Sequence, residues 1–131
     1  MYLIDTNIAI HARDGTRSII ERMIQHQGGM ALSALSLAEL QRGLVSDLVA
    51  APLRRLRLGI FIENLPVVSF DANAAGAYGQ IIAACGWVRG RDFHRMIAAH
   101  ALSLNATLVT DNERDFRDIP GLAVENWLAV T

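Results

Sequence analysis

The sequence predicts an α/β fold with a central, mostly parallel sheet and helices on both faces. Short apolar runs at residues 2–5, 30–35 and 106–110 have the length and composition of buried strands. Segments with apolar residues at helical spacing lie between and around them, as at 16–27 and 93–104. Strands that alternate with helices are joined by crossover connections, which favour a parallel sheet.

The remaining elements continue the same alternation. Ser36, with Glu39 three residues later, has the pattern of a capping box and predicts a helix from Ser36 through Leu44. Pro52 begins another helix, since proline is favoured in a first helical turn. The expected elements that follow are a short strand at 66–70, a helix capped by Asp71 that runs to Cys85, and a last strand at 122–124. A single domain over residues 1–131 accommodates all of them.

Composition places the chain among folded proteins of the cytoplasm. Of the 131 residues, 52% are hydrophobic and 19% charged, which excludes a disordered segment. Cys85 is the single cysteine, so no internal disulfide can form, and its small neighbours indicate a core residue in a reducing compartment. Neither a secretory leader pattern nor an apolar run of about 18 residues is present, so no membrane association is expected.

The charge pattern permits nucleic-acid binding without requiring it. The formal net charge is −1, which argues weakly against a polyanion as partner. All 12 cationic residues are arginines, however, and the guanidinium fork matches pairs of phosphate oxygens. They cluster at Arg54, Arg55 and Arg57, at Arg89, Arg91 and Arg95, and at Arg114 and Arg117. Solvated helix faces explain these clusters as well as an RNA-binding surface does.

Acidic residues follow the predicted strands. Asp5 ends the first strand, Glu39 lies early in the helix after the second, and Asp111 and Asp115 follow Thr110 at the end of a later strand. In parallel sheets, sites form outside the carboxyl ends of the strands. Capping or arginine pairing would account for any one acid, but converging acids repel one another unless a cation lies between them. Oxygen ligands favour Mg²⁺ or Mn²⁺, and such ions support phosphodiester hydrolysis.

Other classes of α/β protein with strand-end acids fit less well. A receiver domain requires a lysine and an acidic pair at the first strand, and this sequence has no lysine. An acid-nucleophile phosphatase requires a second aspartate where Asn7 stands. The glycine-rich fingerprints of dinucleotide and nucleoside triphosphate binding are both absent.

Four segments in order resemble the motifs of VapC-type PIN domains, ribonuclease toxins of toxin–antitoxin pairs. The first is Tyr2–Asn7, an apolar strand ending in Asp-Thr-Asn. The second is Ser36–Gly43, in which a glycine follows four residues after Glu39. The third and fourth are Arg95–Leu102 and Thr107–Phe116. The ending at 124–127 is also similar, so the resemblance covers nearly the whole chain.

The resemblance implies a PIN-like fold and a Mg²⁺- or Mn²⁺-dependent endoribonuclease that cuts a structured RNA, with initiator tRNA as one target among relatives. It also implies a homodimer and inhibition by a cognate VapB-like antitoxin whose C-terminal segment covers the acidic site. By position, the catalytic and metal-binding residues are Asp5, Glu39, Asp115 and the residue at His94. Thr6, Asn7 and Thr110 are the supporting polar groups.

His94 departs from the family pattern. The third motif usually has aspartate there, whereas this chain reads Phe93-His94-Arg95. Asp92 is two residues away, about 200° around a helix, and is expected to be the helix N-cap. A neutral His94 near a helix N-terminus can bind a metal softer than Mg²⁺, or it marks a chain with impaired cleavage. The alternative function is therefore a non-catalytic PIN-like module that binds antitoxin or RNA.

The other histidines have simpler interpretations. His100 lies on the apolar stripe of its helix and is expected to be a core residue with a hydrogen-bond partner. His11 and His26 have no partner at ligand spacing and are expected at the surface.

Overall fold

A computed structural model describes residues 1–128 and contains one five-stranded sheet, in which every pairing is parallel. The spatial order of the strands is β3-β2-β1-β4-β5. The strands are β1 (Tyr2–Ile4), β2 (Met30–Ser33), β3 (Val67–Val68), β4 (Thr107–Val109) and β5 (Val124–Glu125). The helices are α1 (Thr6–Arg13), α2 (Arg17–Gln25), α3 (Ala34–Ser46), α4 (Ala51–Glu63), α5 (Ala72–Cys85), α6 (Asp92–Ser103) and the 3₁₀ helix η1 (Glu113–Phe116).

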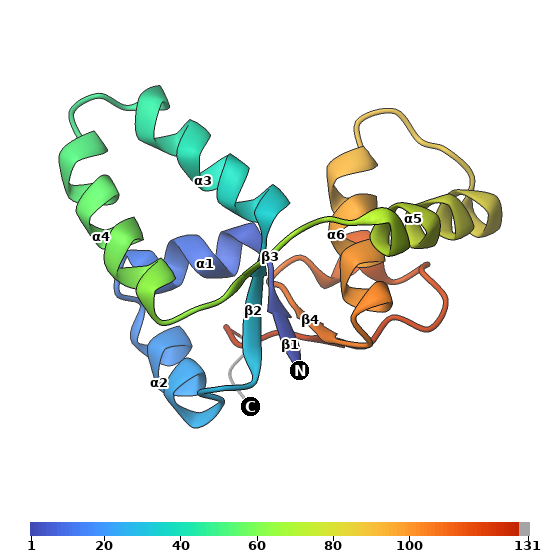
Figure 1. The fold of residues 1–131 in the computed structure, drawn as a ribbon, viewed down its shortest axis with the longest axis horizontal. Helices are drawn as coiled ribbons and strands as arrows, with labels where there is room; N and C mark the ends of the chain where they lie inside the picture. The colour runs from blue at the N-terminus through green and yellow to red at the C-terminus, as the bar shows by residue number, and fades with distance from the viewer. Residues whose placement is uncertain (129–131) are drawn as a thin grey trace.

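The helices form two layers, one on each side of the sheet. Figure 1 shows α1 to α4 on one side of the strands, and α5 and α6 on the other. This arrangement confirms the α/β class, the parallel sheet and the two helical layers that the sequence predicts. None of the helices in the described part of the chain combines the length and apolar character that a membrane crossing requires.

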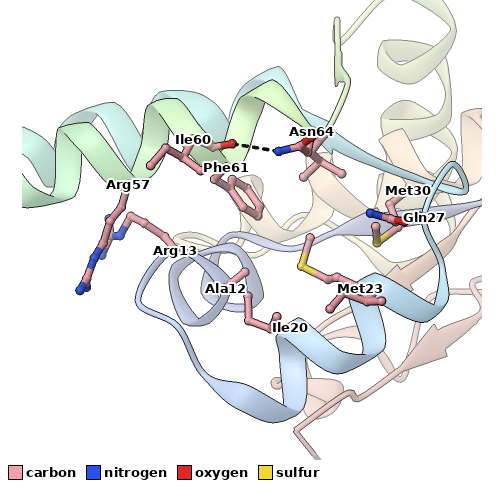
Figure 2. A pocket seen from close by; sticks show the side chains of 12 residues that line it. Ala12, Arg13, Ile20, Met23, Gln27, Met30, Arg57, Ile60, Phe61 and Asn64 are labelled. Atoms are coloured by element: carbon pink, nitrogen blue, oxygen red, sulfur yellow. Dashed lines mark hydrogen bonds between the residues drawn. The ribbon is translucent and has the colours of Figure 1, made fainter.

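The first helical layer contains an apolar pocket. Residues of α1, α2 and α4 surround a space of about 380 Å³, and Figure 2 shows Met23, Ile20 and Phe61 along it. Arg13 and Arg57 lie together at one end of this pocket, away from the apolar side chains at the other end. Both arginines pair with Asp14, at 3.0 and 4.0 Å, so the pocket is an apolar recess bordered at one end by this ion-pair cluster.

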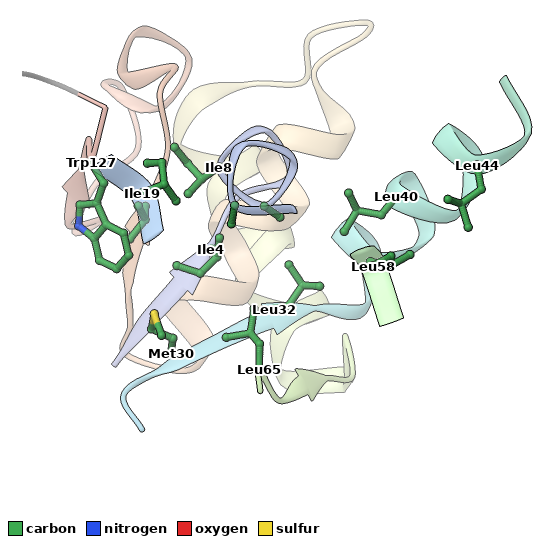
Figure 3. Packing of buried hydrophobic residues seen from close by; sticks show 13 residues of the cluster. Ile4, Ile8, Ile19, Met30, Leu32, Leu40, Leu44, Leu58, Leu65 and Trp127 are labelled. Atoms are coloured by element: carbon green, nitrogen blue, oxygen red, sulfur yellow. The ribbon is translucent and has the colours of Figure 1, made fainter. Parts of the chain in front are cut away.

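Two hydrophobic cores hold the layers to the sheet. The core under α1 to α4 contains Ile4 and Leu32 from the strands, with Ile8, Leu40 and Trp127 packed around them (Figure 3). The second core, under α5 and α6, is built on alternate strand residues such as Leu3, Ala31 and Leu108. Neighbouring strand residues thus point to opposite faces, as expected for a sheet covered on both sides.

One predicted helix start is wrong. The structure begins α3 at Ala34 rather than Ser36, because the Ser33 hydroxyl accepts a hydrogen bond from Leu35 N at 3.1 Å and caps the helix. The Ser36–Glu39 capping box therefore does not form, and Glu39 lies in the second turn. In contrast, Asp71 caps α5 as predicted by accepting from Ala74 N at 3.0 Å.

Candidate active site

Three adjacent strands end together at one edge of the sheet. Ile4 of β1 lies in register with Leu32 of β2 on one side and with Val109 of β4 on the other. The next residue along β1 is Asp5, whose backbone N donates to Val109 O at 2.9 Å. Thr110 follows β4 at the same level. The register therefore gathers the residues after β1, β2 and β4 at the carboxyl edge.

Asp5 is a buried carboxylate at the middle of this edge. Its side chain is 4% exposed and caps α1 by accepting from Thr6 N at 2.8 Å. Its second oxygen accepts from Thr110 Oγ1 at 2.8 Å. Burial nevertheless raises the pKa of Asp5, because these hydrogen bonds and the nearby charge of His94 offset the desolvation only in part. A positive charge placed at this edge would stabilise the ionised form of Asp5.

His94 and Asp115 approach the same edge from α6 and η1. His94 Nδ1 lies 3.2 Å from Asp115 Oδ2, and the two side chains are 38% and 29% exposed. Asn112 Nδ2 donates to the same oxygen of Asp115 at 2.6 Å, and Asn112 N donates to Thr110 Oγ1 at 3.0 Å. A chain of hydrogen bonds therefore runs from Asp115 through Asn112 and Thr110 to Asp5.

Buried polar atoms without partners collect here as well. Within residues 1–128, the buried side-chain atoms that lack a hydrogen-bond partner are Thr6 Oγ1, Ser36 Oγ, Asp111 Oδ1 and His100 Nε2. The first three follow β1, β2 and β4, the strands that meet at the candidate site. Buried polar groups are normally paired with protein, water or an ion, so three unpaired oxygens at adjacent strand ends mark this edge as a polar site that water or a bound ion completes.

Asp111 is a site residue that the motif resemblance does not single out. Its negative charge raises the pKa of Asp5, so the two carboxylates are close enough to repel each other. In the sequence, Asp111 is only one of several polar residues after Thr110, and the motif resemblance points to Asp115 instead. Its buried Oδ1 distinguishes it, and burial of one oxygen is not visible in a residue pattern.

Glu39 is not brought into contact with the other acids. Its charged neighbour is Arg42, one turn further along α3, at 4.0 Å, and its side chain is 31% exposed. Among the charges that act on Asp5 are His94 and Asp111, but not Glu39. Asn7, the remaining supporting residue, is exposed on α1. The role of Glu39 as a shared metal ligand therefore stays a prediction.

Asp92 is not the N-cap that the sequence predicts. Arg91 occupies the capping position of α6 without a capping side chain, and Asp92 is the first helical residue. The Asp92 carboxylate instead accepts hydrogen bonds from Tyr78 Oη at 2.5 Å and from Trp87 Nε1 at 3.0 Å. Tyr78 belongs to α5 and Trp87 to the loop after it. Their hydrogen bonds hold the Asp92 carboxylate away from the backbone N–H groups that an N-cap would bond.

The other histidines have structural roles. His100 is 1% exposed and hydrogen-bonds through Nδ1 to Ser33 Oγ at 2.8 Å, and burial lowers its pKa, so it stays neutral. This confirms His100 as a core residue. His11 and His26 are half-buried rather than fully at the surface. His26 packs against the rings of Tyr2 and Trp127, which also contact each other.

The donor set fits a hard divalent cation that keeps part of its water shell. In the described residues, 1–128, no three His, Cys, Asp or Glu side chains are grouped closely enough to enclose an ion. Magnesium commonly binds through one or two carboxylates and completes its shell with water and substrate phosphates. Asp5, with its raised pKa, and Asp111, with its unpaired Oδ1, supply that number of carboxylates. His94 and Asp115 border them.

Comparison with known proteins accounts for this arrangement. The model of the PIN domain family matches residues 2–122. The chain belongs to the PIN domain family. It is 34% identical to "Ribonuclease VapC2" of Rickettsia felis, a match that covers 97% of this chain and 98% of the relative. It is 36% identical to the "tRNA(fMet)-specific endonuclease VapC" of Shigella flexneri over 96% of this chain and 97% of that protein.

Solved structures agree with the sequence comparison. A crystal structure of VapBC2 from Rickettsia felis bound to a promoter DNA fragment superposes with a TM-score of 0.85 at 32% identity, covering 96% of this chain and 98% of that one. DNA-bound VapBC from Salmonella typhimurium gives 0.87 at 33% identity, covering 96% and 97%. The chain is thus a nuclease of the VapC ribonuclease type, and PIN-domain nucleases are in general dependent on a divalent metal.

Proposed function

We propose that this chain is a Mg²⁺- or Mn²⁺-dependent endoribonuclease that cuts a structured RNA such as initiator tRNA and is inhibited by a VapB-like antitoxin. The observation that carries the proposal is the edge where β1, β2 and β4 end. A buried carboxylate with a raised pKa lies there, and three unpaired buried oxygens belong to residues that closely follow these strands. The names of the relatives from Shigella flexneri and Rickettsia felis support the substrate and the partner.

The chain's own residues would hold the ion and orient the reacting groups. Asp5 and Asp111 would ligate it, with Glu39, Asp115 and His94 as the further ligands that the family pattern adds. Once bound, a divalent ion activates water and stabilises the charge on a phosphodiester. Thr110 fixes one oxygen of Asp5, and Thr6 N fixes the other, so the carboxylate is preorganised for this role.

A non-catalytic binding module is the second candidate function, and His94 is the observation that favours it. The imidazole lies 3.2 Å from Asp115 Oδ2, where it offers a neutral nitrogen or a positive charge instead of an anionic oxygen. Hard cations prefer oxygen ligands, so this substitution weakens Mg²⁺ binding relative to Mn²⁺. The module would bind RNA or antitoxin without cutting.

The apolar pocket between α1, α2 and α4 supports the antitoxin as partner. It has the size and apolar lining to take side chains from an amphipathic segment. Arg57 on its rim is 43% exposed and lies 4.0 Å from Asp14, so it can also pair with an acidic residue of the partner. The reading frame adjacent to this gene is expected to encode that small antitoxin-like partner.

Cleavage of initiator tRNA under metal titration tests the proposal. The wild-type chain is expected to cut with Mn²⁺ or Mg²⁺, to lose activity in EDTA and to regain it when the ion is restored. Asp5→Asn should abolish cleavage. The amide oxygen can still cap α1, but the side chain no longer offers a negative charge to a cation. The control, Asp47→Asn, changes an exposed carboxylate at the end of α3. Metal-independent binding with no turnover at any ion concentration would select the non-catalytic module.

A further inference from the structure

Trp87 is an exposed tryptophan whose indole N–H is fixed. Its side chain is 58% exposed, whereas Trp127 is 2% exposed. Trp87 Nε1 donates to Asp92 Oδ1 at 3.0 Å, and Tyr78 Oη donates to the same oxygen. The loop around it is compact, since Arg91 N donates to Val88 O at 3.2 Å. The indole is therefore held in place while more than half of its surface stays in solvent.

The loop that carries Trp87 also carries two available cations. Arg89 and Arg91 are exposed, and within residues 1–128 neither has a carboxylate oxygen at ion-pair distance. The nearby acid Asp118 is occupied, because both of its oxygens accept from Arg95, at 2.8 and 2.7 Å. Asp92 Oδ1 accepts from Trp87 and Tyr78, and no cation lies at ion-pair distance from Asp92 within residues 1–128. The carboxylate of Asp92 keeps its negative charge, because both of its donors are neutral, so the two arginines leave this surface with a net positive charge.

The loop lies beside the candidate active site. It joins α6 at Asp92, two residues before His94, whose charge acts on Asp5. Because α6 leads into the start of β4, its N-terminal end lies at the carboxyl edge of the sheet. Figure 1 shows the α5–α6 connection at that end, across from the start of α3. A polymer bound at the edge could therefore contact the loop with an adjoining segment.

We propose that residues 86–91 form an RNA subsite in which one unpaired base stacks on Trp87 and the adjoining phosphates bind Arg89 and Arg91. Proteins that bind single-stranded nucleic acid combine an aromatic stacking surface with cations along the backbone. An indole whose N–H is bonded to Asp92 loses little conformational entropy when a base stacks on it, and arginine forks match phosphate oxygens. The inference rests on the proposed ribonuclease function and adds a substrate contact outside the carboxylate site.

Binding of a 12-nucleotide oligoadenylate in EDTA tests this subsite in the absence of cleavage. Stacking should quench the fluorescence of Trp87, while the buried Trp127 gives a constant background. An abasic 12-mer, which has the phosphates but no bases, should bind more weakly and quench little. Trp87→Ala should raise the Kd for oligoadenylate about 10-fold, the loss expected for one base–aromatic stack, and leave the Kd for the abasic oligomer unchanged. Arg89→Gln should weaken both oligomers and reduce the salt dependence.

Val88→Ala is the matched control, since Val88 is the neighbouring exposed apolar residue at 44% exposure. Equal oligoadenylate affinity for Trp87→Ala and Val88→Ala would overturn the inference. A change in Trp87 fluorescence that depends on protein concentration and not on RNA would also overturn it, because a second copy of the chain would then cover the loop. Metal-dependent tRNA cleavage, measured in parallel, separates the two proposals. If the wild type cleaves tRNA and Trp87→Ala cleaves it equally well, the subsite is refuted and the ribonuclease function is not. If RNA quenches Trp87 but no cleavage occurs, the subsite is supported and the ribonuclease function is refuted.

Discussion

Replacing His94 with aspartate should restore an acidic metal site at a cost to the metal-free fold. The imidazole now lies 3.2 Å from Asp115 Oδ2, a pairing that is neutral or attractive. Aspartate would place two like charges there, which at about 4 Å costs about 4 kcal/mol at an effective dielectric constant of 20 and about 1 kcal/mol in water. Both side chains are about one third exposed and aspartate is shorter than histidine, so the lower figure applies.

Thermal unfolding and RNA cleavage measure the two effects separately. A change of about 1 kcal/mol in a chain of 131 residues corresponds to about 4 °C in Tm. In EDTA, His94→Asp should melt about 4 °C below the wild type, and Mg²⁺ should raise its Tm more than that of the wild type. Cleavage with Mg²⁺ should increase at least 10-fold, which requires about 1.4 kcal/mol of added transition-state stabilisation.

His94→Asn is the matched control, because it removes the imidazole without adding charge. It should melt close to the wild type in EDTA and gain no response to Mg²⁺. If His94→Asp and His94→Asn behave alike in both conditions, and neither gains activity, then position 94 lies outside the coordination shell and the reasoning fails.

Three further outcomes are expected. The chain should form a homodimer through the exposed apolar end of the α3–α4 hairpin, where Leu48 is 78% exposed. Light scattering should give a dimer mass for the wild type and a monomer mass for Leu48→Glu. Ile24→Ser, in the apolar pocket, should weaken capture of the protein encoded by the adjacent reading frame, whereas Val67→Ser on the outer strand should not. Arg95 lowers the pKa of Asp118 from its ordinary value of 3.8. The pair therefore stabilises the fold fully at pH values above 3.8, and this stabilisation is lost as the pH falls through the lowered pKa of Asp118. The Tm difference between wild type and Asp118→Asn should therefore shrink from pH 5 to pH 3; a constant difference would argue against the pair.

The part of the site that follows from strand geometry could be predicted from the sequence. Asp5 comes directly after an apolar run, and a parallel sheet places that position at the edge where sites form. Thr110 follows β4 by the same rule, and its hydrogen bond to Asp5 joins the two predicted positions. These residues are local to their strands, so hydrophobic pattern alone locates them.

The part that depends on competition between hydrogen-bond partners could not be predicted. Asp92 has the sequence context of an N-cap, but Tyr78 and Trp87 take its carboxylate. Ser33 caps α3 in place of Ser36, because β2 ends earlier than its apolar run. The hydrogen-bond partners that decide these cases lie 2 to 14 positions away in the sequence. Which partner forms the bond depends on how the helices pack and not on local helix propensity.

Metal-dependent stabilisation of wild type and Asp5→Asn tests the central claim, that a cation completes the edge where β1 and β4 end. Burial raises the pKa of Asp5, so its ionised carboxylate destabilises the fold at pH 7. In EDTA at pH 7, Asp5→Asn should therefore be at least as stable as the wild type. Mn²⁺ at 100 times its Kd should stabilise the wild type by about 2.7 kcal/mol, which is about 10 °C for a chain of this length. Asp5→Asn should show no such shift. An equal shift in both proteins would mean that the ion binds elsewhere and would contradict the account.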